Sequence, residues 1–132
     1  MSEPPAESAQ PAPDTMPYTV TGDLTGLRAF VRARAIALGL PADRADLLVL
    51  AVNELATNTL QYTDKGGTAR VWASDAQVVC DVVDSGPMRS FETMPAPDSV
   101  RGRGLAIVAR IVDAVATTTT AGGTLVRVRM DL

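Results

Sequence analysis

The sequence predicts an α+β fold, a two-layer sandwich in which a mostly antiparallel, mixed sheet is covered on one face by three helices. Apolar residues recur with helical spacing in some segments and alternate with polar residues in others, in the order β, α, α, β, β, loop, α, β, β. The 132 residues suffice for one domain. Because only 4% of the residues are aromatic, we expect a core of Leu, Val, Ile and Ala packed between the layers.

The first 17 residues differ in composition from the rest of the chain. They contain five of the nine prolines, three acidic residues and no Lys or Arg. This composition predicts a disordered or loosely attached leader over residues 1–17, whose simplest role is solubility. The domain is then expected over residues 18–132.

A short strand and two helices are predicted to open the domain. The strand covers residues 18–21, and Asp23 after it can cap a helix over residues 24–38. Gly39 and the proline that follows end this helix. The next helix runs to about residue 62 and is apolar over a wide arc, which predicts extensive burial.

The second half of the chain alternates strands with one helix. Strands over residues 68–74 and 77–83 are predicted to form a hairpin. Residues 88–103 show no clear periodicity and are predicted to be a loop, with a helix starting near Gly104. Two final strands, over residues 115–120 and 124–130, complete the sheet.

Composition excludes several classes of protein. The chain has no His and one cysteine, Cys80, so it cannot form an internal disulfide, a thiolate zinc site or a His-based catalytic triad. Its longest apolar run, residues 47–52, is too short to cross a membrane, and its N-terminus lacks the pattern of a signal peptide. We therefore expect a cytoplasmic protein without membrane contact.

The charge of the chain is concentrated in the leader. The net charge is −3, and the residues after the leader carry twelve acidic and twelve basic side chains. A neutral domain with scattered Arg residues does not indicate direct binding to nucleic acid.

The pair Glu54 and Asn58 is the first candidate for chemistry. The two side chains lie one turn apart on one face of the second helix, and Leu47, Leu50 and Ala51 lie on the same face. A carboxylate in an apolar stripe needs a partner, a metal or a cavity. Alone, the pair is better explained by a helix with a narrow polar edge, because a Glu and an Asn four residues apart often occur by chance.

Three glycine-containing motifs follow. Asp84 leaves a Val-rich strand and is followed by Gly86, which lets a ligand approach the backbone. Gly102 and Gly104 open a helix, where free N–H groups can bind an anion. Thr124 follows two glycines and begins the last strand. Taken singly, the Asp84 and Thr124 motifs are better explained as turns, and the two glycines before the helix as a flexible helix entry.

The four motifs in this order resemble the GHKL ATPase superfamily, and within it the small bacterial anti-sigma factor serine/threonine kinases. AVNELATNTLQYT resembles the N box, GRGLAIV the glycine-rich second box and GGTLVRVRMDL the closing hairpin. The resemblance covers residues 18–132 and implies a Bergerat-type ATP-binding fold.

The resemblance also implies roles for the helical residues. Asn58 would hold Mg²⁺ against the phosphates, as an oxygen ligand suited to a hard cation. Glu54 would be the general base that takes a proton from the attacking hydroxyl. Gly102 and Gly104 would offer backbone donors to the phosphates, and residues 88–101 would form the ATP lid.

Asp84, Gly86 and Thr124 would bind the base. Asp84 would accept a hydrogen bond from the adenine amino group, Gly86 would let the base lie close to the chain, and Thr124 would complete the pocket. The chain departs from the family pattern at Met88, where a second glycine is usual, and at Tyr62, where His is frequent. Neither departure removes Glu54 or Asn58.

The resemblance implies a soluble ATP- and Mg²⁺-dependent serine/threonine kinase. It would phosphorylate an antagonist protein, sequester a sigma factor and form a homodimer. Two alternatives use the same fold: a non-catalytic ATP-binding interaction module, and a stand-alone catalytic domain of the histidine kinase type acting in trans. A third is an α+β interaction domain whose motifs are accidental.

Overall fold

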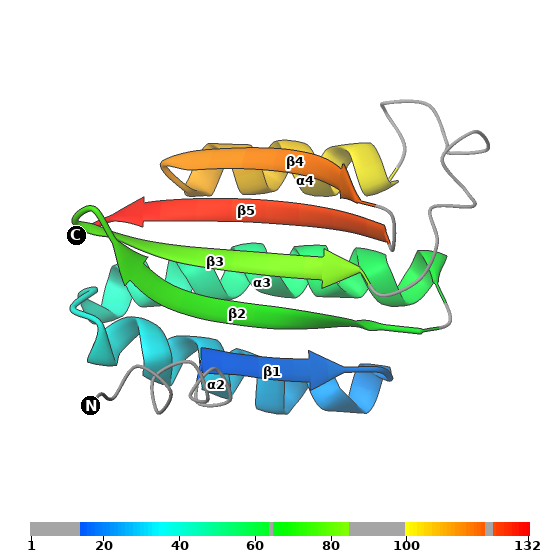
Figure 1. Cartoon of the computed structure of the whole chain (residues 1–132), viewed down its shortest axis with the longest axis horizontal. Coiled ribbons are helices and arrows are strands. Elements are labelled where there is room, and N and C mark those ends of the chain that lie inside the picture. The colour runs from blue at the N-terminus through cyan, green and yellow to red at the C-terminus, as the bar shows by residue number, and fades with distance from the viewer. Residues whose placement is uncertain (1–13, 64, 85–99, 121–122) are drawn as a thin grey trace, which may run out of the picture.

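A computed structural model describes residues 14–63, 65–84, 100–120 and 123–132 of the chain (Figure 1). Its elements follow the predicted order of strands and helices. They are β1 (Thr15–Tyr18), the 3-10 helix η2 (Thr21–Asp23), α2 (Leu24–Ala37), α3 (Ala42–Tyr62), β2 (Gly67–Ser74), β3 (Gln77–Asp84), α4 (Val100–Ile111), β4 (Ala114–Thr120) and β5 (Gly123–Asp131).

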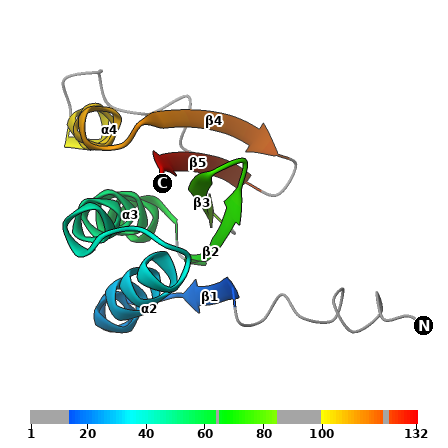
Figure 2. The same ribbon diagram turned by 90° about the vertical axis from the view of Figure 1, so that its left-hand side faces the viewer.

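The five strands form one sheet in the order β1-β2-β3-β5-β4, and the helices α2, α3 and α4 lie on one of its faces (Figure 2). The two-layer α+β prediction is therefore confirmed. Every strand pair in the described part of the chain is antiparallel, so the sheet is more regular than the mixed sheet that we predicted.

The core fills the space between the helices and the sheet, and it consists mainly of Leu, Val and Ala, as expected. Leu48 of α3 is fully buried, as are Val71 and Val78 on the central strands. Cys80 of β3 also has no exposed surface, and burial raises the pKa of its thiol. In a neutral apolar core this thiol acts as a small hydrophobic residue.

The opposite face of the sheet carries polar side chains. Arg127 donates two hydrogen bonds to Asp81, from Nε at 2.7 Å and from Nη2 at 2.8 Å. The guanidinium groups of Arg70 and Arg127 lie 4.8 and 5.3 Å from the centre of the Trp72 ring. The guanidinium–ring contacts shield part of the indole on a face that the described helices leave open.

The predicted position of the first strand was wrong by three residues along the sequence. The first strand covers Thr15–Tyr18 instead of residues 18–21, so it includes three residues that we assigned to the leader. Asp23 does not cap α2 with its side chain. Its carboxylate instead accepts hydrogen bonds from the backbone N–H groups of Thr19, at 2.8 Å, and Val20, at 3.2 Å. These bonds lower the pKa of Asp23.

The remaining elements lie close to the predicted ones, with one exception. The β2–β3 hairpin turns at Asp75 and Ala76, whose positive φ angles of 55° and 63° fit a two-residue turn. The third helix begins at Val100, before the predicted start at Gly104. No helix in the described part of the chain is long and apolar enough to span a membrane.

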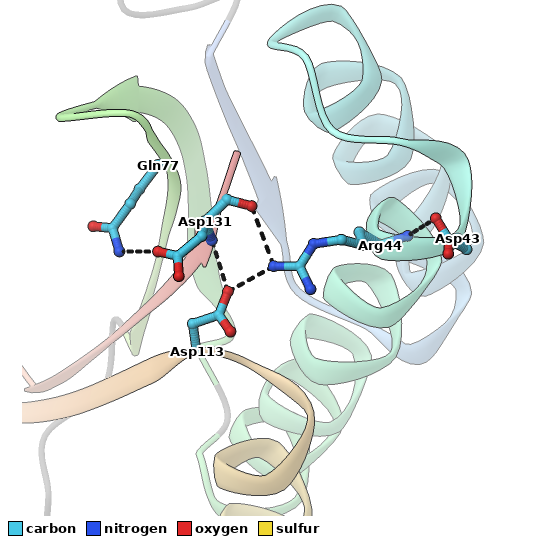
Figure 3. Close-up of polar contacts among 5 residues, drawn as sticks. All are labelled: Asp43, Arg44, Gln77, Asp113 and Asp131. Carbon is cyan, nitrogen blue, oxygen red and sulfur yellow. Dashed lines mark hydrogen bonds and ion pairs between the residues drawn. The ribbon is translucent and has the colours of Figure 1, made fainter.

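A polar junction closes one end of the sandwich (Figure 3). Nη2 of Arg44, in the first turn of α3, donates to Oδ2 of Asp113 at 2.6 Å and to the carbonyl of Asp131 at 3.2 Å. The same Asp113 oxygen accepts the backbone N–H of Asp131 at 2.7 Å. Nε2 of Gln77 donates to Asp131 at 2.7 Å. The junction ties α3 to the α4–β4 connection, to the end of β5 and to the β2–β3 hairpin.

Candidate functional site

The elements that carry the described site residues meet toward the end of the sandwich opposite this junction. In Figure 1, the C-terminal half of α3, the end of β3 and the starts of α4 and β5 all lie on the right-hand side of the molecule. Asp84 is the last residue of β3, and Thr124 lies next to the first residue of β5. The fold thus brings together motifs that are far apart in the sequence.

The helix α3 contributes Glu54 and Asn58. Asn58 is buried, with 7% of its surface exposed, whereas Glu54 is half-buried. Of the three apolar residues that we placed on the face of Glu54, Leu47 and Leu50 are 37% and 45% exposed, whereas Ala51 is fully buried. The face is therefore partly open to solvent, with Glu54 half-buried and Asn58 buried one turn later.

The sheet contributes Asp84 and Thr124. Both are buried, with 7% and 3% of their surface exposed. Val83 is paired with Leu125, so the residues that follow and precede them, Asp84 and Thr124, lie at one position along the two neighbouring strands. The antiparallel register therefore places a carboxylate and a hydroxyl side by side beneath α3.

Buried polar groups are concentrated at this end of the helix–sheet interface. Asn58 and Thr59 lie in the last turns of α3 and Thr63 follows it, Asp84 ends β3, and Thr124 lies near the start of β5; all five are buried. Elsewhere the core cluster of this interface is apolar, apart from the Cys80 thiol. Polar groups in a protein interior are normally paired, so a cluster of them marks a functional site or a bound ligand.

Two hydroxyl groups in this cluster have no hydrogen-bond partner among the described residues. They are Oγ1 of Thr124 and Oη of Tyr18. By contrast, Oγ1 of Thr59 donates to the carbonyl of Leu55 at 3.1 Å. A buried hydroxyl without a partner costs about 1–3 kcal/mol, and a ligand or an ordered water removes that cost.

Two consecutive glycines let the strands approach closely at the site. Gly66 has a φ of 70°, and a Cβ there would overlap the carbonyl oxygen of Tyr18. A Cβ at Gly67 would overlap the carbonyl oxygen of Val83. Because both obstacles are backbone atoms, a side chain at either position would force the strands apart.

The glycines of α4 take different positions in the helix than predicted. Since α4 begins at Val100, Gly102 lies in its first turn and Gly104 in its second. The first four N–H groups of a helix have no partner within it. Gly102 thus has a free backbone donor. Gly86, Met88 and the predicted lid, apart from its last two residues, lie outside the described residues.

The described residues offer too few oxygen ligands to bind Mg²⁺ alone, so a bound ligand would have to supply the others. No group of three or more His, Cys, Asp or Glu side chains that could hold a metal occurs in the described ranges. Asn58 offers one buried amide oxygen. Mg²⁺ typically takes one or two protein oxygens, and completes its shell with phosphates and water. The residues therefore fit a metal that arrives with a phosphorylated ligand.

Tyr18 and Thr59 belong to this cluster, although the sequence analysis did not single them out as site residues. Thr59 follows Asn58 on α3, and Tyr18 lies at the end of β1. Their position depends on strand register and on the packing of α3, for which the sequence carries no local signal.

Solved structures of three proteins share this fold. The RsbU and RsbW domains of Rv1364c from Mycobacterium tuberculosis match with a TM-score of 0.67 and 21% identity, over 89% of this chain and 32% of that one. A blue-light activated histidine kinase of Erythrobacter litoralis EL346 matches with a TM-score of 0.53 and 20% identity, over 83% and 61% of the two chains. The Acinetobacter baumannii histidine kinase AdeS matches with a TM-score of 0.52 and 11% identity, over 95% and 71%.

These likenesses establish the fold alone, because the identities are low. The chain spans about a third of the length of the first of these structures and about three fifths of the second. A search of curated proteins finds no significant match. The sequence pattern of the histidine kinase-like ATPase domain, however, matches residues 17–130. This match confirms the resemblance to the GHKL superfamily, and the chain belongs to the family of histidine kinase-like ATPase domains.

Proposed function

We propose that the chain binds ATP with Mg²⁺ at the end of the helix–sheet interface that carries Asn58, Asp84 and Thr124. The observation that carries this proposal is the buried Thr124 hydroxyl, which has no hydrogen-bond partner among the described residues and lies beside the buried Asp84. A purine base offers polar edge atoms and a flat apolar face, which suit a polar cluster embedded in an apolar interface. Membership of an ATPase family supports a nucleotide as the ligand.

Each buried residue has a distinct part in this binding. Asp84 accepts a hydrogen bond from the adenine amino group, and Thr124 bonds to a neighbouring edge atom of the base. Asn58 holds Mg²⁺ through its amide oxygen. Gly102 and Gly104 at the positive end of α4 offer backbone donors to the phosphates, and Gly102 lies in the first turn, where N–H groups have no partner within the helix. Gly86 and residues 88–101 keep the roles given by the family resemblance.

We further propose that the chain is a serine/threonine protein kinase with Glu54 as its base. ATP supplies the γ-phosphoryl group. Glu54 accepts the proton of a serine or threonine hydroxyl on a partner protein, while that oxygen forms a bond to phosphorus and the bond to ADP breaks. The half-buried position of Glu54 supports this role, because a protein substrate must reach the base from solvent.

The partners follow from the resemblance to anti-sigma factor kinases. The substrate is an antagonist protein, and the nucleotide state controls whether the chain, as a homodimer, holds that protein or a sigma factor in the cytoplasm. The fold likeness to a structure that contains an RsbW domain supports this assignment. A histidine kinase-type reaction would need a His on another protein, because this chain has none.

Calorimetric titration with ATP and Mg²⁺ tests the binding proposal. The variant Asp84→Asn replaces a pure acceptor by an amide and should weaken ATP binding by about 10-fold or more. Asp81→Asn is the matched control, since Asp81 lies on the same strand, is equally buried and faces the other side of the sheet. A wild-type chain without ATP affinity, or equal affinities for wild type and Asp84→Asn, contradicts the proposal.

Transfer of labelled phosphate tests the kinase proposal separately. Wild-type protein that binds ATP and phosphorylates a serine or threonine of the antagonist protein supports it. Binding without any transfer indicates the non-catalytic interaction module instead.

A further inference from the structure

Tyr18 is a fully buried residue whose phenol lies directly on Gly67. A Cβ at Gly67 would lie 2.7 Å from Oη and 3.0 Å from Cζ of Tyr18. The phenol thus occupies the space that a side chain on the neighbouring strand β2 would otherwise fill. The absence of a side chain at Gly67 is therefore what allows the hydroxyl of Tyr18 to extend across β2.

The strand register carries the phenol toward Asp84. Gly67 is the Cα partner of Tyr18 on one side and of Asp84 on the other. Side chains of register partners point to the same face of a sheet, so Tyr18, Gly67 and Asp84 form one row beneath α3. Because the middle position has no side chain, the ends of this row can interact.

The electrostatics of Tyr18 agree with this placement. Burial raises the pKa of Tyr18 to about 12, and the negative charge of Asp84 contributes to the increase, whereas the Thr59 side chain acts in the opposite direction. The phenol therefore keeps its proton at physiological pH and can serve as a donor. The hydroxyl makes no hydrogen bond of full geometry among the described residues, although the Thr59 side chain lies close enough to lower its pKa.

We propose that Tyr18 is a positioning residue for base recognition. When a nucleotide fills the site, its hydroxyl donates to one oxygen of Asp84, directly or through one water, and turns the other oxygen toward the exocyclic amino group of adenine. A carboxylate accepts several hydrogen bonds at once, so this contact is compatible with the other interactions of Asp84. The inference rests on the proposed binding of ATP.

The test compares ATP with purine riboside 5′-triphosphate, which lacks the amino group. Wild-type protein should bind ATP at least about 10-fold more tightly, as expected for a hydrogen bond to a charged acceptor. Tyr18→Phe keeps the buried ring and removes only the hydroxyl. This variant should lose about 10-fold in ATP affinity and bind the analogue as wild type does. Trp72→Phe, on the opposite face, should change neither affinity.

The outcomes separate this inference from the proposed function. Equal losses for both nucleotides in Tyr18→Phe would show a merely structural role and overturn the inference. An unchanged preference for ATP in that variant would overturn it as well, with ATP binding intact. A wild type that binds both nucleotides equally would refute the role of Asp84 and, with it, that of Tyr18. Absence of ATP binding by wild type would overturn the proposed function itself.

A second measurement leaves the Tyr18 side chain in place. The chain has two tyrosines, Tyr18 and Tyr62, so 3-fluorotyrosine incorporated in a Tyr62→Phe background gives one fluorine resonance. This resonance should shift with ATP and stay close to its free position with the analogue. Identical shifts with both nucleotides contradict a contact that depends on the amino group.

Discussion

Asn58 on α3 and Asp84 at the end of β3 are buried at the same end of one helix–sheet interface, each with 7% of its surface exposed. The first offers an amide oxygen, and the second a carboxylate. Since the helix and the strand approach the site from different layers, a ligand between them contacts both at once. The predictions below separate what each layer contributes.

Asn58→Ala should abolish Mg²⁺-dependent ATP binding and leave the fold intact. The substitution removes the amide oxygen proposed as a metal ligand, and the residue lies in the polar cluster and outside the apolar core. Titration calorimetry with ATP, with and without Mg²⁺, measures the effect. Asn53→Ala is the control on the same helix, because Asn53 faces α2 and accepts a hydrogen bond from Arg28 at 3.0 Å. Equal affinities of Asn58→Ala and wild type would refute the assignment.

Glu54→Gln should separate binding from chemistry. Gln keeps the shape of the side chain and removes its basicity, so ATP affinity should stay within a few-fold, while phosphoryl transfer falls by about 10²-fold or more. Labelled phosphate transfer to the antagonist protein, run beside a nucleotide-binding assay, measures both. Asp46→Asn is the control on the same helix, because Asp46 forms an ion pair with Arg32 at 2.8 Å. This variant should transfer phosphate at the wild-type rate. Transfer at the parent rate by Glu54→Gln would exclude Glu54 as the base.

Thr124→Val should lower the affinity for ATP and raise the stability of the fold. Val has the shape of Thr without its hydroxyl, which is buried and lacks a hydrogen-bond partner in the described part of the chain. We expect the free energy of unfolding to rise by about 1 kcal/mol and ATP affinity to fall by about 10-fold. Urea denaturation and calorimetry measure the two quantities. Thr117→Val, at an exposed position of β4, should leave ATP affinity unchanged. A loss of stability in Thr124→Val would contradict the absence of a partner.

The polar junction should make stability depend on pH through Asp113. The backbone N–H of Asp131 and the side chain of Arg44 lower the pKa of Asp113 below its ordinary value of 3.8. A carboxyl group whose pKa is lower in the folded state stabilises the fold above the unfolded-state pKa, and this contribution disappears as the pH falls through the folded-state pKa.

Asp113→Asn should therefore be less stable than wild type at pH 7, and the difference should shrink below about pH 4. Because both partners are about one third exposed, the effect should be smaller than ~1 kcal/mol. Urea denaturation at pH 7 and at about pH 3 measures it. ATP binding should not change, since the junction lies at the far end of the sandwich. A pH-independent difference would show that the effect of the substitution is not electrostatic.

The sequence predicts helices and strands correctly where the hydrophobic periodicity and the turn residues indicate the same element. The helices α2 and α3 follow from apolar residues at helical spacing, and the β2–β3 hairpin follows from alternation around Asp75 and Ala76. The third helix starts earlier than predicted because its first turn, from Val100, contains no apolar periodicity that would mark it as helical. In a first turn, where N–H groups have no partner within the helix, glycine costs less than its propensity suggests.

Other features require the three-dimensional structure. The segment after Tyr18 has high β-propensity, yet the strand lies before it, because Tyr18 pairs with Gly67 and Asp23 holds Thr19 and Val20 outside the sheet. The polar cluster could be predicted for Asn58, Asp84 and Thr124 from their motifs. The participation of Tyr18 in the cluster could not be predicted. It depends on which residues are neighbours across the strands, and no local pattern specifies this register.

The burial of Cys80 gives the chain a built-in reporter. It is the only cysteine in the sequence and has no exposed surface, so thiol reagents can reach it only when the sheet and the helix layer separate. The rate of its modification thus measures the opening of the core without any label or substitution. In the native state thiol reagents do not reach Cys80. A cysteine introduced at an exposed position such as Ala116 could therefore be labelled selectively with a fluorophore that reports on partner binding.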